Sequence, residues 1–276
     1  MAGVIGSNPI IPTYFLGHNR GRVFMLSFQT VSCDGLLDCK VKIVQAGQGY
    51  KASMPCALLA AAVSERPAGL VLDVGCGVAG ASLCLAWRFP GIAIHCIDSY
   101  RPFLSYARLN RKINSFADKL VFRAGSVADQ DQVWPIYDVV MTNPPFYDPK
   151  NAKESPNSYK RQAHVLQIPL ATWVDFCWQS LTEKGQCFFL FPSFRAQEVC
   201  ELMQQKYGSS LFQLSIFFSP QRPAPWILFQ WNKDPAAHRV LPPYLPPFYN
   251  AKGQLEPFGR AVFNDGSSLQ HAFRIG

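Results

Sequence analysis

The chain has 276 residues and a formal net charge of +8 at pH 7. Its hydrophobic content of 49% and charged content of 16% are typical of a globular protein and exclude a chain dominated by disorder. No apolar run is long enough to span a bilayer, and the N-terminus lacks the basic and apolar regions of a signal peptide. We therefore expect a cytoplasmic protein without membrane contact, built as one large domain with additions or as two small domains.

The nine cysteines are scattered, without a Cys-x-x-Cys pair or neighbouring histidines. Most of them, such as Cys96, Cys177 and Cys187, stand inside apolar runs, where a thiol behaves as a small core side chain in a reducing compartment. The cysteine pattern therefore predicts no metal site.

The first half of the chain predicts a hairpin followed by a parallel sheet. Residues 22–28 and 40–45 alternate as strands joined through residues 32–35, so residues 1–52 are expected to form an N-terminal leader and hairpin. A helix rich in alanine and leucine is predicted next, at residues 54–65. The following strands are predicted at residues 70–74, 92–97, 119–124 and 137–142, with helices between the first three. This alternation predicts a doubly wound parallel sheet.

The second half adds three more strands. A polar, basic loop is predicted at residues 148–165, followed by a helix at 168–181, a strand at 185–191 and a helix at 194–207. The last two strands, 211–218 and 226–231, are separated by a loop too short for a helical crossover, so they must pair antiparallel. The predicted fold class is α/β, with a doubly wound, Rossmann-like sheet of seven strands closed by an antiparallel terminal hairpin.

A glycine-rich turn follows the first parallel strand. Residues 71–80 read Val-Leu-Asp-Val-Gly-Cys-Gly-Val-Ala-Gly, and Gly75 and Gly77 permit a tight turn with close approach of a ligand to the backbone. Asp73 precedes these glycines, and a carboxylate there would repel a pyrophosphate but accept from an ammonium group. The motif therefore favours a nucleoside ligand with an amino-acid tail, such as S-adenosylmethionine, over a dinucleotide.

An acidic residue ends the second parallel strand. Asp98 stands where a carboxylate can bind the ribose hydroxyls of a nucleoside. Its alternative role is to cap the helix predicted to begin at Arg101 and Pro102. The sequence leaves both roles open.

Residues 143–146, Asn-Pro-Pro-Phe, follow a buried strand of β-branched residues. Pro144 and Pro145 fix φ and remove two backbone donors, so the turn is stiff and rich in acceptors. Asn143 offers its side-chain oxygen, and Phe146 offers a flat apolar face. This arrangement suits a planar amino group, although an Asn-Pro turn after a strand also occurs without any function.

Positive charge surrounds this motif. A basic cluster over residues 101–123 is interpreted as a solvated helix face. The net charge of +8 and a pI near 9.1 indicate a polyanionic partner. Basic and aromatic side chains after the motif are predicted to bind nucleic acid: Tyr147, Lys150, Lys153, Lys160 and Arg161.

The glycine turn, the acidic strand end and the Asn-Pro-Pro-Phe turn follow one another in an order that resembles class I S-adenosylmethionine-dependent methyltransferases. Over residues 20–270, the chain resembles the bacterial tRNA adenine-N6 methyltransferases that modify valine tRNA next to the anticodon. The resemblance is carried by Gln-Gly-Tyr-Lys before an Ala-Leu-Leu-Ala helix, by Leu-Asp-Val-Gly-Cys-Gly, by Asn-Pro-Pro-Phe, and by Phe-Gly-Arg-Ala near the C-terminus. These motifs begin at residues 48, 57, 72, 143 and 258.

The resemblance implies an S-adenosylmethionine-dependent domain at residues 53–235, a C-terminal tail or lid at 236–276, and a tRNA substrate. The sequence leaves the oligomeric state open, with a monomer favoured. It implies that Asn143, Pro144, Pro145 and Phe146 are catalytic. It implies that the cofactor contacts Asp73, Gly75, Gly77, Asp98, Ser126, Val127 and Asn143. Lys51 joins the residues expected to contact RNA.

Two positions depart from the family pattern. Pro55 stands where relatives usually carry aspartate, and Ser126 stands where an acidic residue commonly contacts the cofactor adenine, so Ser126 or Asp129 is expected to make that contact. The alternative functions are methylation of a protein glutamine, methylation of guanine N2 in ribosomal RNA, and RNA binding without catalysis.

Overall fold

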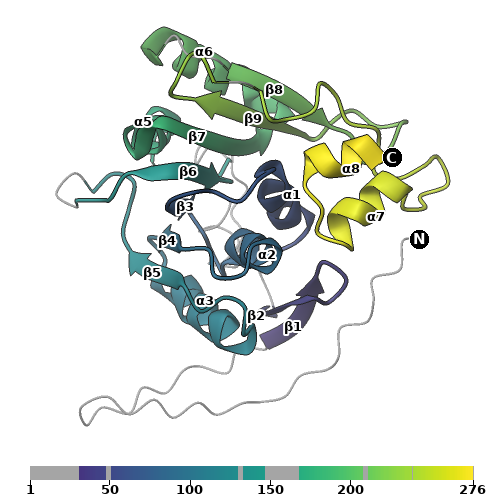
Figure 1. Cartoon of the computed structure of the whole chain (residues 1–276), viewed down its shortest axis with the longest axis horizontal. Coiled ribbons are helices and arrows are strands. Elements are labelled where there is room, and N and C mark those ends of the chain that lie inside the picture. Colours follow the sequence, from purple (N-terminus) through teal and green to yellow (C-terminus); the bar gives the residue numbers. More distant parts are fainter. Residues whose placement is uncertain are drawn as a thin grey trace, which may run out of the picture.

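A central sheet of seven strands organises the protein (Figure 1). The structure is a computed structural model that describes residues 31–47, 51–129, 133–146, 168–207, 211–237 and 239–275. The strands of the central sheet are β3 (Val71–Val74), β4 (Ile94–Asp98), β5 (Leu120–Ala124), β6 (Tyr137–Thr142), β7 (Leu181–Pro192), β8 (Leu211–Ile216) and β9 (Trp226–Asn232).

The strand order confirms the predicted fold class. The strands lie in the order β5-β4-β3-β6-β7-β9-β8, and the pairs from β5 to β7 are parallel. Strand β9 inserts between β7 and β8 and pairs antiparallel with both. Because the order reverses at β3 and β6, the carboxyl ends of these two strands form the switch point at which ligands bind in open α/β sheets.

Helices cover both faces of the sheet. The first face carries α1 (Met54–Ala62), α2 (Gly80–Arg88), α3 (Arg101–Ile113), α7 (Pro257–Phe263) and α8 (Leu269–Ile275). The second face carries α5 (Leu170–Gln179) and α6 (Ala196–Tyr207), which follows the short 3-10 helix η1 (Ser193–Arg195). No helix within the described ranges is both long and apolar enough to cross a membrane.

Alternating side chains of the buried strands separate the two hydrophobic cores. Val71 of β3 points to the α1 and α2 side, whereas its neighbours Leu72 and Val74 point to the α5 and α6 side. Successive side chains of a strand project from opposite faces, so near-continuous apolar runs are needed in strands covered on both faces. This explains why the sequence predicts the bounds of β6 without error.

The hairpin differs from the sequence-based prediction in its first strand. Its strands are β1 (Val31–Leu36) and β2 (Val41–Ala46), and the predicted strand at residues 22–28 lies outside the described residues. Residues 32–35 were predicted to form the connection, but they belong to β1. The Asp34 carboxylate accepts hydrogen bonds from Ser32 Oγ at 2.7 Å and from Gln45 Nε2 of β2 at 2.8 Å, which holds this turn-forming sequence in a strand.

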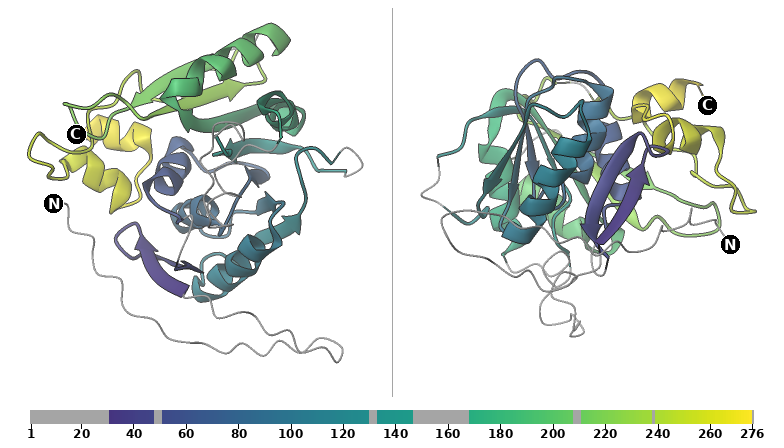
Figure 2. Two further views of the ribbon diagram at one scale, coloured as in Figure 1. Left: turned by 180° about the vertical axis from the view of Figure 1, so that it is seen from behind. Right: turned by 90° about the horizontal axis from the view of Figure 1, so that it is seen from below.

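Two asparagines of α3 attach the hairpin to the domain; Figure 2 shows the two elements side by side. Asn110 accepts from Val44 N at 2.7 Å and donates to Val44 O at 3.0 Å. One helical turn later, Asn114 accepts from Lys42 N at 3.0 Å and donates to Lys42 O at 2.8 Å. The two amides thus replace the peptide groups of a neighbouring strand along one edge of β2.

Replacement of Asn110 by alanine is expected to lower the free energy of unfolding by about 2–3 kcal/mol, because it leaves buried backbone groups of the hairpin without partners. Asn110 is fully buried and also donates to Val78 O at 3.0 Å. Urea unfolding followed by circular dichroism measures the change. Arg108→Ala, an exposed position on the same helix, is the control and should change stability by less than about 0.5 kcal/mol. Equal stability of the two variants would contradict this account.

The C-terminal segment packs on the first face of the sheet. Phe258, Val262 and Leu269 of α7 and α8 are buried in the same core as α1 (Figure 1). Gly259 is required at its position, because a Cβ there would lie 2.6 Å from the carbonyl oxygen of Phe248. The function of residues 236–276 as a lid stays a prediction. Pro55, the departure from the family pattern, lies in the first turn of α1, a position where proline is well tolerated.

Candidate functional site

The glycine turn crosses the carboxyl ends of β3 and β4. Gly75 has a φ of 72° and Gly77 a φ of 55°, in the left-handed region that favours glycine. The backbone N–H groups of Gly75 and Cys76 donate to Ile97 O at 2.9 and 3.0 Å. The turn is therefore fixed against β4 immediately before Asp98.

The third glycine of the motif brings two helices together. A Cβ on Gly80 would lie 2.8 Å from Cys56 Sγ and 3.0 Å from the Cβ of Ala52. The absence of a side chain at Gly80 thus allows the start of α2 to pack directly on α1. The role that the structure shows for Gly80 is therefore helix packing, which positions the turn.

Asp98 connects the glycine turn to the start of α3. Its Oδ2 accepts from Gly77 N at 2.8 Å, and its Oδ1 accepts from Tyr100 N at 2.8 Å. Burial raises the pKa of the Asp98 carboxyl to about 6, although both backbone hydrogen bonds act in the opposite direction. The N-cap residue of α3 is Tyr100, without a side-chain cap hydrogen bond, so the expectation that Asp98 caps this helix is wrong. The Asp98 carboxylate instead joins the glycine turn to the segment before α3, and its contact with ribose hydroxyls stays a prediction.

Asp73 lies deeper than Asp98. Its side chain is 2% exposed, and it accepts a 2.5 Å hydrogen bond from the hydroxyl of Ser82 in α2. Burial raises the pKa of Asp73 to about 7, with a further increase caused by the charge of Asp98. The contact shown for this carboxylate is structural, and its predicted contact with an ammonium group stays a prediction.

The raised pKa of Asp73 predicts a pH-dependent stability. The folded protein favours the neutral form, so the stabilisation is complete below the unfolded pKa of about 4 and is lost as pH rises towards 7. We expect the unfolding free energy of wild type to fall by a few kcal/mol between about pH 4 and 7, and we expect Asp73→Asn to lack this decrease. Urea unfolding of both proteins across this range tests it. Parallel pH profiles for wild type and variant would show that Asp73 is not the titrating group.

Residues 125–129 lie beside Asp98, after β5. Gly125 N donates to Asp98 O at 3.2 Å, which fixes the start of the segment. Ser126 N donates to the Asp129 carboxylate at 2.8 Å, while Ser126 Oγ accepts from Ala128 N at 3.2 Å. The structure thus brings Ser126 and Asp129 together, as needed if either binds the cofactor adenine. Their contact with adenine stays a prediction.

Asn143 carries a buried oxygen atom that makes no hydrogen bond in the described part of the chain. It follows Thr142, whose hydroxyl donates to Val74 O at 2.8 Å and accepts from Trp173 Nε1 of α5 at 2.9 Å. These bonds fix the end of β6 to the end of β3. Buried polar atoms are nearly always paired, so an acceptor that has no partner among the described residues is a candidate binding position at the switch point of the sheet.

Comparison with known proteins finds a match over the part of the chain that holds this site. Residues 52–159 match the family model of the methyltransferase small domain. The glycine turn, Asp98 and the Asn-Pro-Pro-Phe turn lie within the matched residues.

Proteins similar to this chain include a tRNA1(Val) (adenine(37)-N6)-methyltransferase from Porphyromonas gingivalis, 27% identical over 166 residues. That match covers 57% of this chain and 64% of the relative, slightly less than two thirds of its length. A protein of the same name from Pedobacter heparinus is 24% identical over 206 residues, covering 72% of this chain and 86% of the relative.

The solved structures agree with the sequence match. The crystal structure of a predicted O-methyltransferase from Agrobacterium tumefaciens superposes with a TM-score of 0.60 at 16% identity. The superposition covers 77% of this chain and 96% of that protein. It confirms the Rossmann-like methyltransferase fold that the sequence predicts.

Phe146, the last residue of the Asn-Pro-Pro-Phe turn, lies towards the β7–β9 part of the sheet. Its ring packs edge-on against Trp226, with ring centroids 5.5 Å apart. Its carbonyl oxygen accepts from Arg195 Nη1 at 2.6 Å. Sequence reasoning missed Trp173 and Arg195, because they stand in elements without a motif and far along the chain from Asn143.

The structure describes one of the predicted nucleic-acid residues, and its contact with RNA stays a prediction. Lys51 is exposed and forms an ion pair with Asp34 at 3.6 Å. It also donates to Ser32 Oγ at 3.2 Å. The other predicted RNA contacts, Tyr147, Lys150, Lys153, Lys160 and Arg161, lie outside the described residues.

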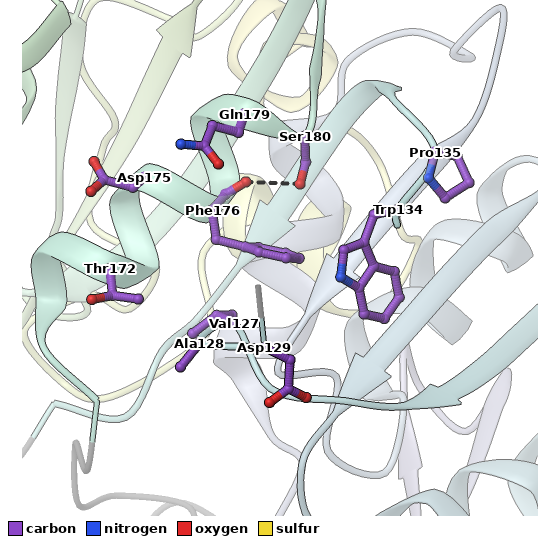
Figure 3. Close-up of a pocket in the computed structure, with 10 residues that line it drawn as sticks. All are labelled: Val127, Ala128, Asp129, Trp134, Pro135, Thr172, Asp175, Phe176, Gln179 and Ser180. Carbon is purple, nitrogen blue, oxygen red and sulfur yellow. Dashed lines mark hydrogen bonds between the residues drawn. The ribbon is translucent and has the colours of Figure 1, made fainter. Parts of the chain in front are cut away.

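A cavity of about 510 Å³ lies between α5 and the segment that leads from β5 to β6 (Figure 3). Trp134 and Phe176 line it and pack edge-on against each other, with ring centroids 5.9 Å apart. Of the predicted cofactor residues, Val127 lines it, so the cavity adjoins the predicted adenine position. No group of three or more His, Cys, Asp or Glu side chains suited to a metal ion occurs within the described ranges.

Proposed function

We propose that this protein is an S-adenosylmethionine-dependent methyltransferase that methylates the exocyclic N6 of an adenine in tRNA. The observation that carries the proposal is the buried Oδ1 of Asn143 at the carboxyl end of β6, which has no hydrogen-bond partner among the described residues. An amino group brought to this position would restore the missing hydrogen bond. By the likeness to its relatives, the target is the adenine next to the anticodon of valine tRNA.

The residues around the glycine turn fit the cofactor. Gly75 and Gly77 form a tight turn in the left-handed conformation, with the Trp173 ring beside Gly75, and Asp98 presents a carboxylate next to this turn. Asp98 would bind the ribose hydroxyls, and the segment of Ser126 and Val127 would contact the adenine ring. When bound, the cofactor supplies an electrophilic methyl group on a sulfonium, which leaves as a neutral thioether.

The target nitrogen is a weak nucleophile, because its lone pair is delocalised into the adenine ring. Asn143 Oδ1 and the carbonyl of Pro144 would accept its two hydrogens and favour a tetrahedral nitrogen whose lone pair points at the methyl group. The nitrogen forms the new N–C bond as the S–C bond breaks, and then releases one proton to solvent. Positioning of the two reactants therefore carries most of the catalysis.

Phe146 supplies the remaining element. An adenine must leave the base stack for its amino group to reach Asn143, and an aromatic ring beside the turn can stack on the exposed base. The hydrogen bond from Arg195 to Phe146 O and the packing on Trp226 fix the exit of the turn. The net charge of +8 favours an RNA substrate. A tRNA-modifying role also fits a cytoplasmic protein.

The test is transfer of a labelled methyl group from S-adenosylmethionine to separate pools of tRNA, ribosomal RNA and release factors. We expect label in tRNA, recovered as N6-methyladenosine after digestion. Label in protein glutamine or in guanine would replace the proposed substrate with one of the alternatives. RNA binding without any transfer would indicate a protein that keeps the fold and lacks the reaction.

A further inference from the structure

Phe194 is an exposed aromatic residue beside the candidate active site. Its side chain is 69% exposed, although it stands in the turn that follows the buried strand β7. β7 is the parallel neighbour of β6, so η1 and Asn143 emerge from the same edge of the sheet. Nothing in the reaction proposed above uses this ring.

The backbone around Phe194 is fixed on both sides. Ser193 N donates to Pro225 O of the β8–β9 loop at 3.0 Å. On the other side, Arg195 donates to Phe146 O and holds the Glu198 carboxylate with two hydrogen bonds of 2.8 and 2.7 Å. The Phe194 ring is therefore held at the exit of the Asn-Pro-Pro-Phe turn and does not belong to a loose surface loop.

The surroundings of Phe194 match a nucleotide better than a protein partner. Its neighbours Ser193 and Arg195 are polar, and the adjoining β8–β9 loop exposes Gln221 and Arg222. A protein interface would need a wider apolar surface at its centre. An exposed ring next to a loop that carries an exposed arginine suits base stacking combined with a phosphate contact. The Glu198 charge is already paired with Arg195.

We propose that Phe194 is a stacking platform for the nucleotide adjacent to the methylated adenine, with Arg222 facing its phosphate. This inference rests on the proposed function and extends it from the target base to its neighbour. A target base turned out of the stack leaves its neighbour without a stacking partner. The Phe194 ring replaces that partner and so favours RNA in which this neighbour is a free, stackable base.

The experiment measures binding of fluorescently labelled valine tRNA by anisotropy, without cofactor. Three RNAs are compared: the unmodified transcript, one with an abasic site 5′ of the target adenine, and one with an abasic site 3′ of it. We expect Phe194→Ala to weaken binding of the unmodified RNA about tenfold. Wild type should bind one of the two abasic RNAs about tenfold more weakly than it binds the unmodified RNA. Phe194→Ala should bind that abasic RNA as tightly as it binds the unmodified RNA. Phe194→Tyr should restore wild-type affinity.

The matched control is Ile136→Ala. Ile136 is 62% exposed, like Phe194, but it precedes the amino end of β6 and so lies at the opposite edge of the sheet. The Ile136→Ala variant should bind all three RNAs with wild-type affinity. If Phe194→Ala loses the same affinity for all three RNAs, or loses none, the proposal that Phe194 is a stacking platform is wrong.

The two proposals fail separately. If wild type methylates tRNA but Phe194→Ala shows no coupling to a neighbouring base, the platform is wrong and the reaction stands. If no methyl transfer occurs but the coupling persists, the reaction is wrong and the platform stands.

Discussion

Asn143→Ala is expected to lower methyl transfer about 10²–10³-fold, the effect typical of removing one positioned hydrogen-bonding group that acts on the reacting atoms. Binding of S-adenosylmethionine should remain measurable, because Asp98 and the glycine turn are unchanged. Single-turnover transfer to tRNA and calorimetric cofactor titration measure the two quantities separately.

Two further measurements separate chemistry from folding for Asn143. Its buried oxygen has no partner among the described residues, so the alanine variant should unfold at the same temperature as wild type or higher. Asn143→Asp keeps an acceptor at the same place and should retain more activity than Asn143→Ala. Turnover of Asn143→Ala equal to that of wild type would remove this residue from the mechanism.

Asp98→Asn is expected to weaken cofactor binding about 10–100-fold, because the ribose hydroxyls would lose a charged acceptor. Burial raises the pKa of Asp98 to about 6, and hydroxyl donors favour its ionised form. Wild-type affinity should therefore be complete above about pH 7 and decline as pH falls through 6. Isothermal titration between about pH 5 and 8 measures both effects.

The control for Asp98 is Asp129→Asn. Asp129 is exposed and accepts from Ser126 N, so its substitution tests the predicted adenine contact without changing the ribose contact. The cofactor affinity of the Asp129→Asn variant should keep the wild-type decline as pH falls through 6. An Asp98→Asn protein that binds the cofactor as tightly as wild type, with an unchanged pH profile, would assign Asp98 to turn capping alone.

The sequence predicts the sheet well because its signals are local. Buried parallel strands need unbroken apolar runs, and the run at residues 137–142 matches β6 at both ends. The hairpin is different. Asp34 and Gly35 have the composition of a turn, but hydrogen bonds to Ser32 and to Gln45 on the partner strand keep them in β1. A contact across the hairpin thus overrides a local preference.

The candidate site divides in the same way. Asp73, Asp98 and Asn143 are recognisable because each lies at or near the carboxyl end of a predicted strand. Phe194 and Arg195 carry no comparable signal, since a Phe-Arg pair after a strand is unremarkable until β7 is paired with β6. Trp173 reads as one more apolar residue of a helix, yet its indole donates to Thr142 next to Asn143.

The sequence by itself determined the order of the strands along the chain, the glycine turn, and the acidic and amide groups at the strand ends, because these depend on neighbouring residues. Only the tertiary structure decided that the Asn143 oxygen has no partner in the described part of the chain and that Asp73 accepts a hydrogen bond from Ser82. It also decided that Arg195 holds the exit of the turn. Whether a polar atom is satisfied depends on every element packed around it, and those elements come from distant parts of the chain.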